Sequence, residues 1–125
     1  MPKWKNNVFG TTSKRQFSVE TVSALQVNKF NSGFHLCPHQ SKKAKGGEDA
    51  VTVLDHFLAA ADGVGGWAES GVDPAIYSRK LCSNLEEGAN KADERMLMRP
   101  KEILVDAVMD NQEMGSATCV VLSLD

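Results

Sequence analysis

Runs of apolar residues bounded by polar turns predict the strands of this chain. Residues 17–30 mix apolar and polar side chains in a way that suits one or two half-exposed antiparallel strands. Residues 50–54 and 57–61 are largely apolar and predict a second strand pair, preceded by a polar, cationic loop at 41–47. The strongly apolar residues 119–124 predict a final strand.

A spacing of three to four residues between apolar positions predicts two helices. Asp73 and Pro74 are a typical N-cap and first helical residue, so a helix is expected over 74–91. Its inward residues would be Tyr77, Leu81 and Leu85. A second helix is expected from Pro100, with inward residues Ile103, Leu104, Ala107, Val108 and Met109. Strands followed by two helices and a strand are typical of an α+β fold.

The composition limits the chain to one small globular domain. Its 125 residues are 42% hydrophobic and 24% charged, and no apolar run approaches the ~20 residues of a membrane-spanning helix. The net charge is −2, with a basic segment at residues 1–19 and an acidic body after it. An acidic body argues against a nucleic-acid-binding protein, which needs a concentrated cationic surface.

The first 18 residues form a basic segment with Lys3, Lys5, Lys14 and Arg15 and no acidic residue. This composition is typical of an organellar transit segment, and the residues around Arg15 resemble a mitochondrial presequence cleavage site. A mitochondrial location is expected if residues 1–18 direct import, and a cytoplasmic location otherwise. A frayed basic terminus is the alternative, since the segment has little helical amphipathicity.

The cysteines Cys37, Cys82 and Cys119 form no CxxC pair, which favours a reducing compartment over a disulfide framework. On an extended strand, His35, Cys37 and His39 would face one side and offer three zinc ligands. Their spacing matches no common zinc motif and no fourth ligand lies nearby. An ordinary strand-to-loop passage is therefore favoured.

Two acidic, glycine-containing segments concentrate the candidate chemistry. Glu48 and Asp49 lead into the first strand of the 50–61 pair, and Asp62 and Gly63 follow the second. An aspartate at the end of a buried strand is costly unless its charge is compensated, and Mg²⁺ or Mn²⁺ compensates it well. Because both segments flank one predicted hairpin, their carboxylates can converge, which favours a metal site over two acids in tight turns.

Residues 63–68 also fit the loose glycine pattern of dinucleotide-binding loops. Against this, Asp62 would point negative charge at a pyrophosphate, and the next helix begins only at Pro74. No βαβ unit follows either. A nucleotide-binding domain is therefore only a distant possibility.

Three motifs follow one another along the chain: GEDA at residues 47–50, ADGVGGW at 61–67 and GSAT at 115–118. Together they resemble the metal-dependent protein serine/threonine phosphatases of the 2C type. The second motif, followed by GVDP at 71–74, is especially similar to the compact branch of that family, which includes mitochondrial members. The resemblance implies two antiparallel β-sheets packed face to face and flanked by antiparallel helices, of which this chain would hold a part.

The resemblance also implies a site for two Mg²⁺ or Mn²⁺ ions. Asp62 matches the aspartate that bridges both ions, and Gly63 the residue that gives a backbone carbonyl to one of them. Glu48 matches a carboxylate on that same ion, with Asp49 close by, through water. The turn at 115–118 would support the site.

The family's phosphate-binding arginine is absent from the stretch before Glu48. Lys43 or Lys45 would have to substitute as a point charge, although a lysine cannot make the bidentate contact of an arginine. A solvated loop is the other role for these lysines.

The activity implied by the resemblance is hydrolysis of phosphoserine and phosphothreonine monoesters in phosphorylated proteins by a metal-activated water. The family's further metal-binding aspartates lie downstream of the segment matched here. Residues 19–125 are therefore expected to be the N-terminal half of such a domain, inactive or weakly active by itself. The alternative is a truncated non-catalytic module that binds metal or phosphoprotein.

Overall fold

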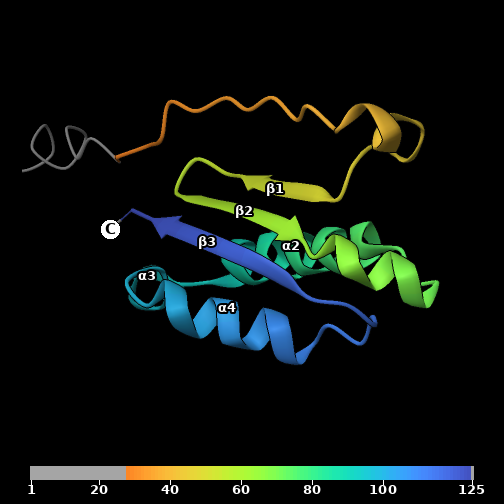
Figure 1. The fold of residues 1–125 in the computed structure, drawn as a ribbon. Helices are drawn as coiled ribbons and strands as arrows, with labels where there is room; N and C mark the ends of the chain where they lie inside the picture. Colours follow the sequence, from red (N-terminus) through yellow and green to blue (C-terminus); the bar gives the residue numbers. More distant parts are fainter. Residues whose placement is uncertain (1–27, 125) are drawn as a thin grey trace, which may run out of the picture.

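A computed structural model describes residues 28–124 of the chain. Within these residues the strands form one antiparallel sheet in the order β1-β2-β3 (Figure 1). The strands are β1 (Asp49–Val53), β2 (Phe57–Gly63) and β3 (Ala117–Ser123), and the helices are α2 (Pro74–Lys91), α3 (Glu94–Leu97) and α4 (Pro100–Met109). The expected α+β class is confirmed, as are both members of the predicted hairpin and the final strand.

Two short 3-10 helices frame the first hairpin. The helix η1 (Gln40–Lys45) precedes β1, and η2 (Gly65–Ser70) follows β2. Each ends at a glycine in the left-handed region, Gly46 with φ 79° and Gly71 with φ 76°, which closes its last turn. The loop predicted at 41–47 is in fact largely the helix η1, because its lysine-rich sequence has no periodic spacing of apolar residues that would predict a helix.

The helix α2 begins as the sequence predicts. The Asp73 carboxylate accepts a hydrogen bond from the backbone N–H of Ala75 at 3.0 Å, and Pro74 occupies the first turn. The helix crosses β1 and β2 and buries Leu81 and Leu85 in the same hydrophobic cluster as Phe57 of β2. The predicted inward face of α2 is therefore confirmed.

The helix α4 packs against α2 along a narrower stripe than the sequence predicts. Ile103 and Ala107 are buried, and Leu104 is partly buried beside them. Val108 and Met109, expected to point inward, are 41% and 72% exposed. Those two expectations are wrong because a ten-residue helix lying against another helix buries only one row of side chains per turn.

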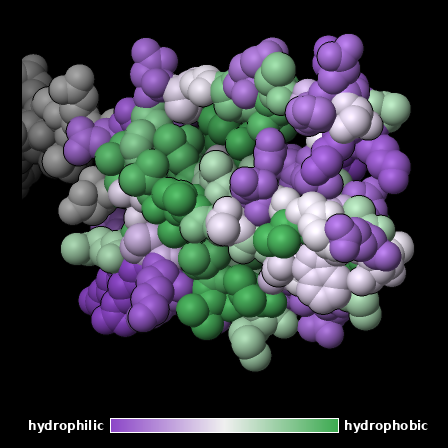
Figure 2. All heavy atoms as spheres, in the orientation of Figure 1, coloured by the Kyte–Doolittle hydropathy of each residue, from purple (hydrophilic) through white to green (hydrophobic). Residues whose placement is uncertain are grey.

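The sheet has one covered and one open face. Residues alternate along each strand, so the helices cover Ala50, Phe57 and Ala59, while Val120 and Leu122 are 65% and 55% exposed on the other side. Figure 2 shows hydrophobic residues gathered across this open face. Among residues 28–124 no second sheet covers it; the segment before η1 runs alongside β1 (Figure 1).

The strand expected within residues 17–30 lies mostly outside the described residues. Residues 28–30 belong to no strand, although the Phe30 backbone N–H donates to the Asp55 carbonyl at 2.7 Å. The basic segment 1–18 also lies outside the described residues. No helix within residues 28–124 is long and apolar enough to cross a membrane.

Candidate functional site

The register of the sheet brings Asp49 and Asp62 together. These two residues are direct cross-strand partners of β1 and β2, and Thr118 of β3 is the partner of Asp62 on the other side. All three side chains are exposed and lie at one end of the open face, because cross-strand partners point to the same side of a sheet. They line a depression of about 410 Å³ beside Leu36.

The two aspartates repel each other. Partial burial raises the pKa of Asp49, and the negative charge of Asp62, a hydrogen bond between the two carboxyl groups and the charge of Glu48 raise it further. A protonated Asp49 hydrogen-bonded to Asp62 is one way to relieve this repulsion, and a bound cation is another. The pair is therefore a place where positive charge is stabilised.

Glu48 lies next to Asp49 in sequence but turns to the helix side of the sheet. Its carboxylate forms an ion pair with Lys42 of η1, and its side chain is only 15% exposed. Its backbone carbonyl accepts hydrogen bonds from the Ser78 hydroxyl of α2 at 2.6 Å and from the Gly63 N–H at 3.1 Å. Glu48 is thus held by α2, β2 and η1 at once.

Gly63 fits only because it has no side chain. A Cβ at this position would lie 2.8 Å from the Glu48 carbonyl oxygen and 2.9 Å from the Pro74 carbonyl oxygen. Because both neighbours are backbone atoms, neither can move aside cheaply. The close packing of β1, β2 and the start of α2 therefore depends on this glycine.

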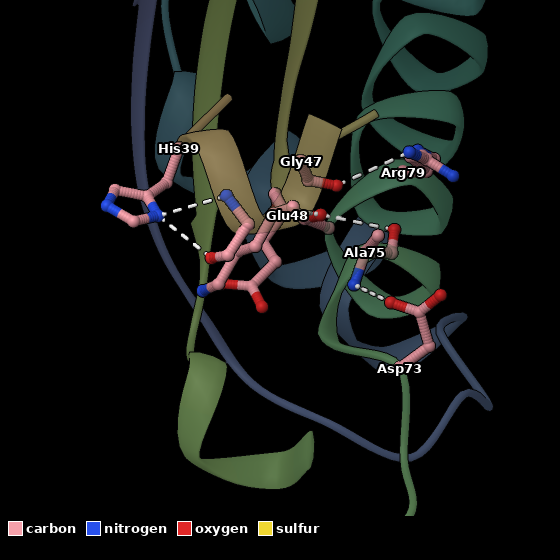
Figure 3. Close-up of polar contacts among 9 residues, drawn as sticks. His39, Gly47, Glu48, Asp73, Ala75 and Arg79 are labelled. Carbon is pink, nitrogen blue, oxygen red and sulfur yellow. Dashed lines mark hydrogen bonds and ion pairs between the residues drawn. The ribbon is translucent and has the colours of Figure 1, made fainter. Parts of the chain in front are cut away.

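The lysines expected to contact phosphate lie on η1. Lys43 and Lys45 are both exposed, and it is Lys42 that contacts a carboxylate of the predicted site, that of Glu48. An arginine does act nearby: the Arg79 guanidinium of α2 donates to the carbonyls of Lys45 at 2.9 Å and Gly47 at 3.4 Å (Figure 3). Arg79 therefore fixes the segment between η1 and β1.

The turn at 115–118 is tied to η2. The Val64 N–H donates to the Ser116 carbonyl at 3.0 Å, and the Trp67 indole N–H donates to the Ser116 hydroxyl at 2.9 Å. Gly115 has φ 148°, and a Cβ there would lie 2.7 Å from the Tyr77 Cβ. These contacts lie beside the strand ends that carry Asp62 and Thr118. That the turn at 115–118 supports a metal site stays a prediction.

The donor atoms suit a hard divalent cation. Two exposed carboxylates with open space beside them match the way Mg²⁺ is held, by one or two carboxylates with water completing the shell. Within residues 28–124 no cluster of three or more His, Cys, Asp and Glu side chains is arranged around a common metal position. The described residues thus fit one hydrated ion at Asp49 and Asp62, and they supply few ligands for a second.

A zinc site and a dinucleotide site find little support in this geometry. His35, Cys37 and His39 are exposed, and the His39 ring accepts a hydrogen bond from the Ser41 N–H at the start of η1. The glycines after Asp62 lead into η2, and α2 begins only at Pro74, so no helix N-terminus rises from the glycine loop as a dinucleotide site requires.

No family model matches the chain. It is similar, however, to curated proteins: 39% identical over 109 residues to Probable protein phosphatase 2C 55 of Arabidopsis thaliana, covering 86% of this chain and 23% of that protein. It is 31% identical over 119 residues to Protein phosphatase 2C homolog 7, mitochondrial, of Saccharomyces cerevisiae, covering 84% of this chain and 35% of that protein. The chain spans about a quarter to a third of the length of these relatives.

A solved structure has the same fold. The X-ray structure of the photosystem II phosphatase PBCP matches 73% of this chain and 36% of its own chain, with a TM-score of 0.63 and 39% sequence identity. Sequence and structure therefore agree on the relationship, over most of this chain and a minor part of each relative.

Proposed function

We propose that this chain, a homologue of the 2C-type protein phosphatases, supplies the first carboxylates of the divalent-cation site in a protein serine/threonine phosphatase domain. The facing pair of Asp49 and Asp62 carries the proposal, because their register places two like charges side by side. In this site Asp62 binds the cation directly and Asp49 contacts it through water. Gly63 would contribute its backbone carbonyl, and Glu48 would be a further carboxylate for the same ion, although here its carboxylate is paired with Lys42 on the helix side of the sheet.

When bound, Mg²⁺ or Mn²⁺ would activate a water and neutralise charge on a phosphate monoester. The chain's own residues hold and orient the site: Asp49 and Asp62 provide its negative charge, and the Glu48–Gly63 backbone contact fixes the strand ends. Lys43 and Lys45 extend from η1 into solvent, where they would attract the phosphoryl group of a phosphorylated protein.

The chain is proposed to be inactive or weakly active by itself. It spans about a quarter to a third of its relatives, and the described residues offer few ligands for a second ion. A non-catalytic module that binds metal or phosphoprotein is the second candidate, favoured by that same shortage of ligands.

Binding of Mn²⁺ to the 125-residue chain, measured by isothermal titration calorimetry, tests the cation site. The wild-type chain should bind one ion, and Asp62→Asn should weaken binding about tenfold or more. Asp106→Asn, an exposed aspartate on α4, is the matched control and should change nothing. No Mn²⁺ binding by the wild-type chain would contradict the proposed function.

Hydrolysis of a phosphopeptide by the same samples tests the activity. The expected rate with Mn²⁺ is at or near background. A clear rate that Asp62→Asn abolishes would contradict the claim that the chain is inactive alone, and it would also exclude the non-catalytic candidate.

We also propose a mitochondrial location for the chain. Two observations support it: residues 1–18 are basic and contain no acidic residue, and the similar yeast protein is named as mitochondrial. Residues 1–30 fused to a fluorescent protein should enter mitochondria. The same fusion with Lys3, Lys5, Lys14 and Arg15 replaced by Gln should stay outside. Cytoplasmic fluorescence of both fusions would contradict the proposal.

A further inference from the structure

The open face of the sheet is divided into rows by the pairing of its strands. Side chains that are cross-strand partners in β1, β2 and β3 form three such rows on this face. The row at one end holds Asp49, Asp62 and Thr118 of the candidate site. The other two, called here the apolar rows, hold only aliphatic side chains: Val53, Leu58 and Leu122 in one, and Val51, Ala60 and Val120 in the other.

The apolar rows enclose a hollow of about 230 Å³ beside Gly33 and Phe34. The Phe34 ring lies at the rim of this hollow and is 62% exposed. Within residues 28–124 no second sheet lies over the hollow or the apolar rows, which Figure 2 shows as a continuous hydrophobic surface. An exposed aromatic ring beside an apolar hollow is typical of the residues that anchor a protein–protein contact.

The size of this surface suits a weak contact between proteins. The apolar rows and Phe34 expose on the order of 500 Å² of apolar surface, near the upper end of the largest patch found on monomers. Two such surfaces in contact would bury about 1,000 Å² in total, the lower limit for a specific protein–protein interface. The expected complex is therefore transient rather than permanent.

The chemistry of the apolar rows favours a partner of the same kind. None of their side chains carries a charge or a hydrogen-bonding group, so they cannot select a charged or polar surface. Their best complement is another uncharged, twisted sheet face, because such faces pack on each other with their strands nearly aligned. A second copy of the chain presents that face, and a two-fold contact uses it twice.

The acidic row limits how two copies can meet. If the rows with Asp49 and Asp62 lay opposite each other, four carboxylates would be brought together in a contact that excludes water. When one copy is turned end for end, the apolar rows overlap and the two acidic rows stay in water at opposite ends. This arrangement keeps Asp49 and Asp62 of both copies accessible.

We propose that the apolar rows and Phe34 form a self-association surface, through which two copies of the chain pack face to face with their acidic rows at opposite ends. A dissociation constant of about 10–100 µM is expected from the small buried area. Chain diluted well below about 10 µM is then monomeric, with the open face in contact with water. This inference does not depend on cation binding at Asp49 and Asp62.

Sedimentation velocity of the 125-residue chain between about 1 and 300 µM tests the proposal. The mass of the wild-type chain should rise with concentration from that of a monomer toward that of a dimer and no further. Val120→Lys places a charge in the apolar rows and should keep the chain monomeric over the whole range. Val105→Lys is the matched control, since Val105 is 49% exposed on α4, and it should associate like wild type.

Phe34→Ala gives a second test that does not alter a strand. Phe34 belongs to no helix or strand, so its removal leaves the packed core unchanged. The variant should dimerise about tenfold more weakly than wild type. Asp62→Asn, measured without divalent cations, should change the dissociation constant less than about twofold, because the acidic rows lie outside the contact.

Four results would overturn the proposal. A wild-type chain that stays monomeric up to about 300 µM would show that the face is left to another polypeptide segment or another protein. Equal loss of association in Val105→Lys and Val120→Lys would place the contact elsewhere, and growth beyond the dimer would exclude a closed two-fold contact. Association at least about fivefold tighter in Asp62→Asn would show that the acidic rows face each other. Each result leaves the proposed cation site to be judged by its own test.

Discussion

The two faces of the sheet are built from the same three strands and differ in almost every physical respect. On the covered face, Phe57 of β2 meets Leu81 and Leu85 of α2 and all three are essentially inaccessible to water. On the open face, the strands carry exposed apolar residues that end in the Asp49–Asp62 pair. Alternation along a strand therefore places the buried core residues on one face and the two aspartates of the proposed cation site on the other.

Substitutions on the two faces of the sheet should affect different properties of the protein. A change on the covered face acts on folding and reaches the site only through the strands. A change at the two aspartates of the open face should act on the proposed cation binding and leave the folded core intact. Matched substitutions on the two faces test this separation, beginning with the largest effect.

Leu85→Ala should lower the free energy of unfolding by about 3 kcal/mol, because Leu85 is fully buried and its neighbours cannot close the cavity. Val120→Ala on the open face should cost less than about 1 kcal/mol, since Val120 is 65% exposed. Urea denaturation followed by circular dichroism measures both. Equal losses for the two variants would show that the open face is buried in solution.

Thr52→Val should cost about 1 kcal/mol. The Thr52 hydroxyl is buried and donates to the Cys82 carbonyl of α2 at 2.8 Å, which joins β1 to the helix. Thr118→Val changes the same residue type on the open face and should alter stability by less than about 0.5 kcal/mol. The same denaturation experiment compares them, and a larger loss for Thr118→Val would contradict the contrast between the faces.

Asp49→Asn should give the smallest effect, a gain of stability below about 0.5 kcal/mol at neutral pH without divalent cations. The pKa of Asp49 in the folded chain is raised above its ordinary 3.8, so the ionised carboxylate destabilises the fold. This penalty is present above the folded pKa and is lost as the pH falls below 3.8. Denaturation at about pH 7 and about pH 3 should show the gain only at the higher pH.

Added Mn²⁺ should make the wild-type chain more stable than Asp49→Asn, which reverses their order of stability without cations. It stabilises the wild-type chain by binding the folded state, and it stabilises Asp49→Asn less because the variant has lost one carboxylate. If Asp49→Asn is less stable than wild type at neutral pH without cations, the two aspartates do not repel each other as described.

The parts of the fold that were predictable have strong local patterns. The hairpin around Asp55 and the helix from Pro74 to Lys91 follow from apolar spacing and an Asp-Pro helix start, and the structure confirms both. The pairing of Asp49 with Asp62 could be expected as well, because the two residues are equidistant from the turn of one hairpin.

The rest depends on contacts between distant parts of the chain. Lys42 is one of three lysines in η1, and nothing in the sequence distinguishes it from Lys43 or Lys45; only the packing of η1 against Gly65 brings it to Glu48. Arg79 faces the η1–β1 connection for the same reason. Contacts that depend on how distant segments pack together produce no periodic pattern in the sequence, so they could not be predicted from it.

Gly63 has a consequence for natural variation. Any single-base change in a glycine codon that replaces the residue adds a Cβ, and at this position the Cβ would press against two backbone carbonyls. Every amino acid that a single-base change can introduce at position 63 therefore carries a Cβ that clashes with backbone atoms. Missense variants at this codon would lower the amount of folded protein in the cell, even though each would leave the carboxylates of Asp49 and Asp62 chemically intact.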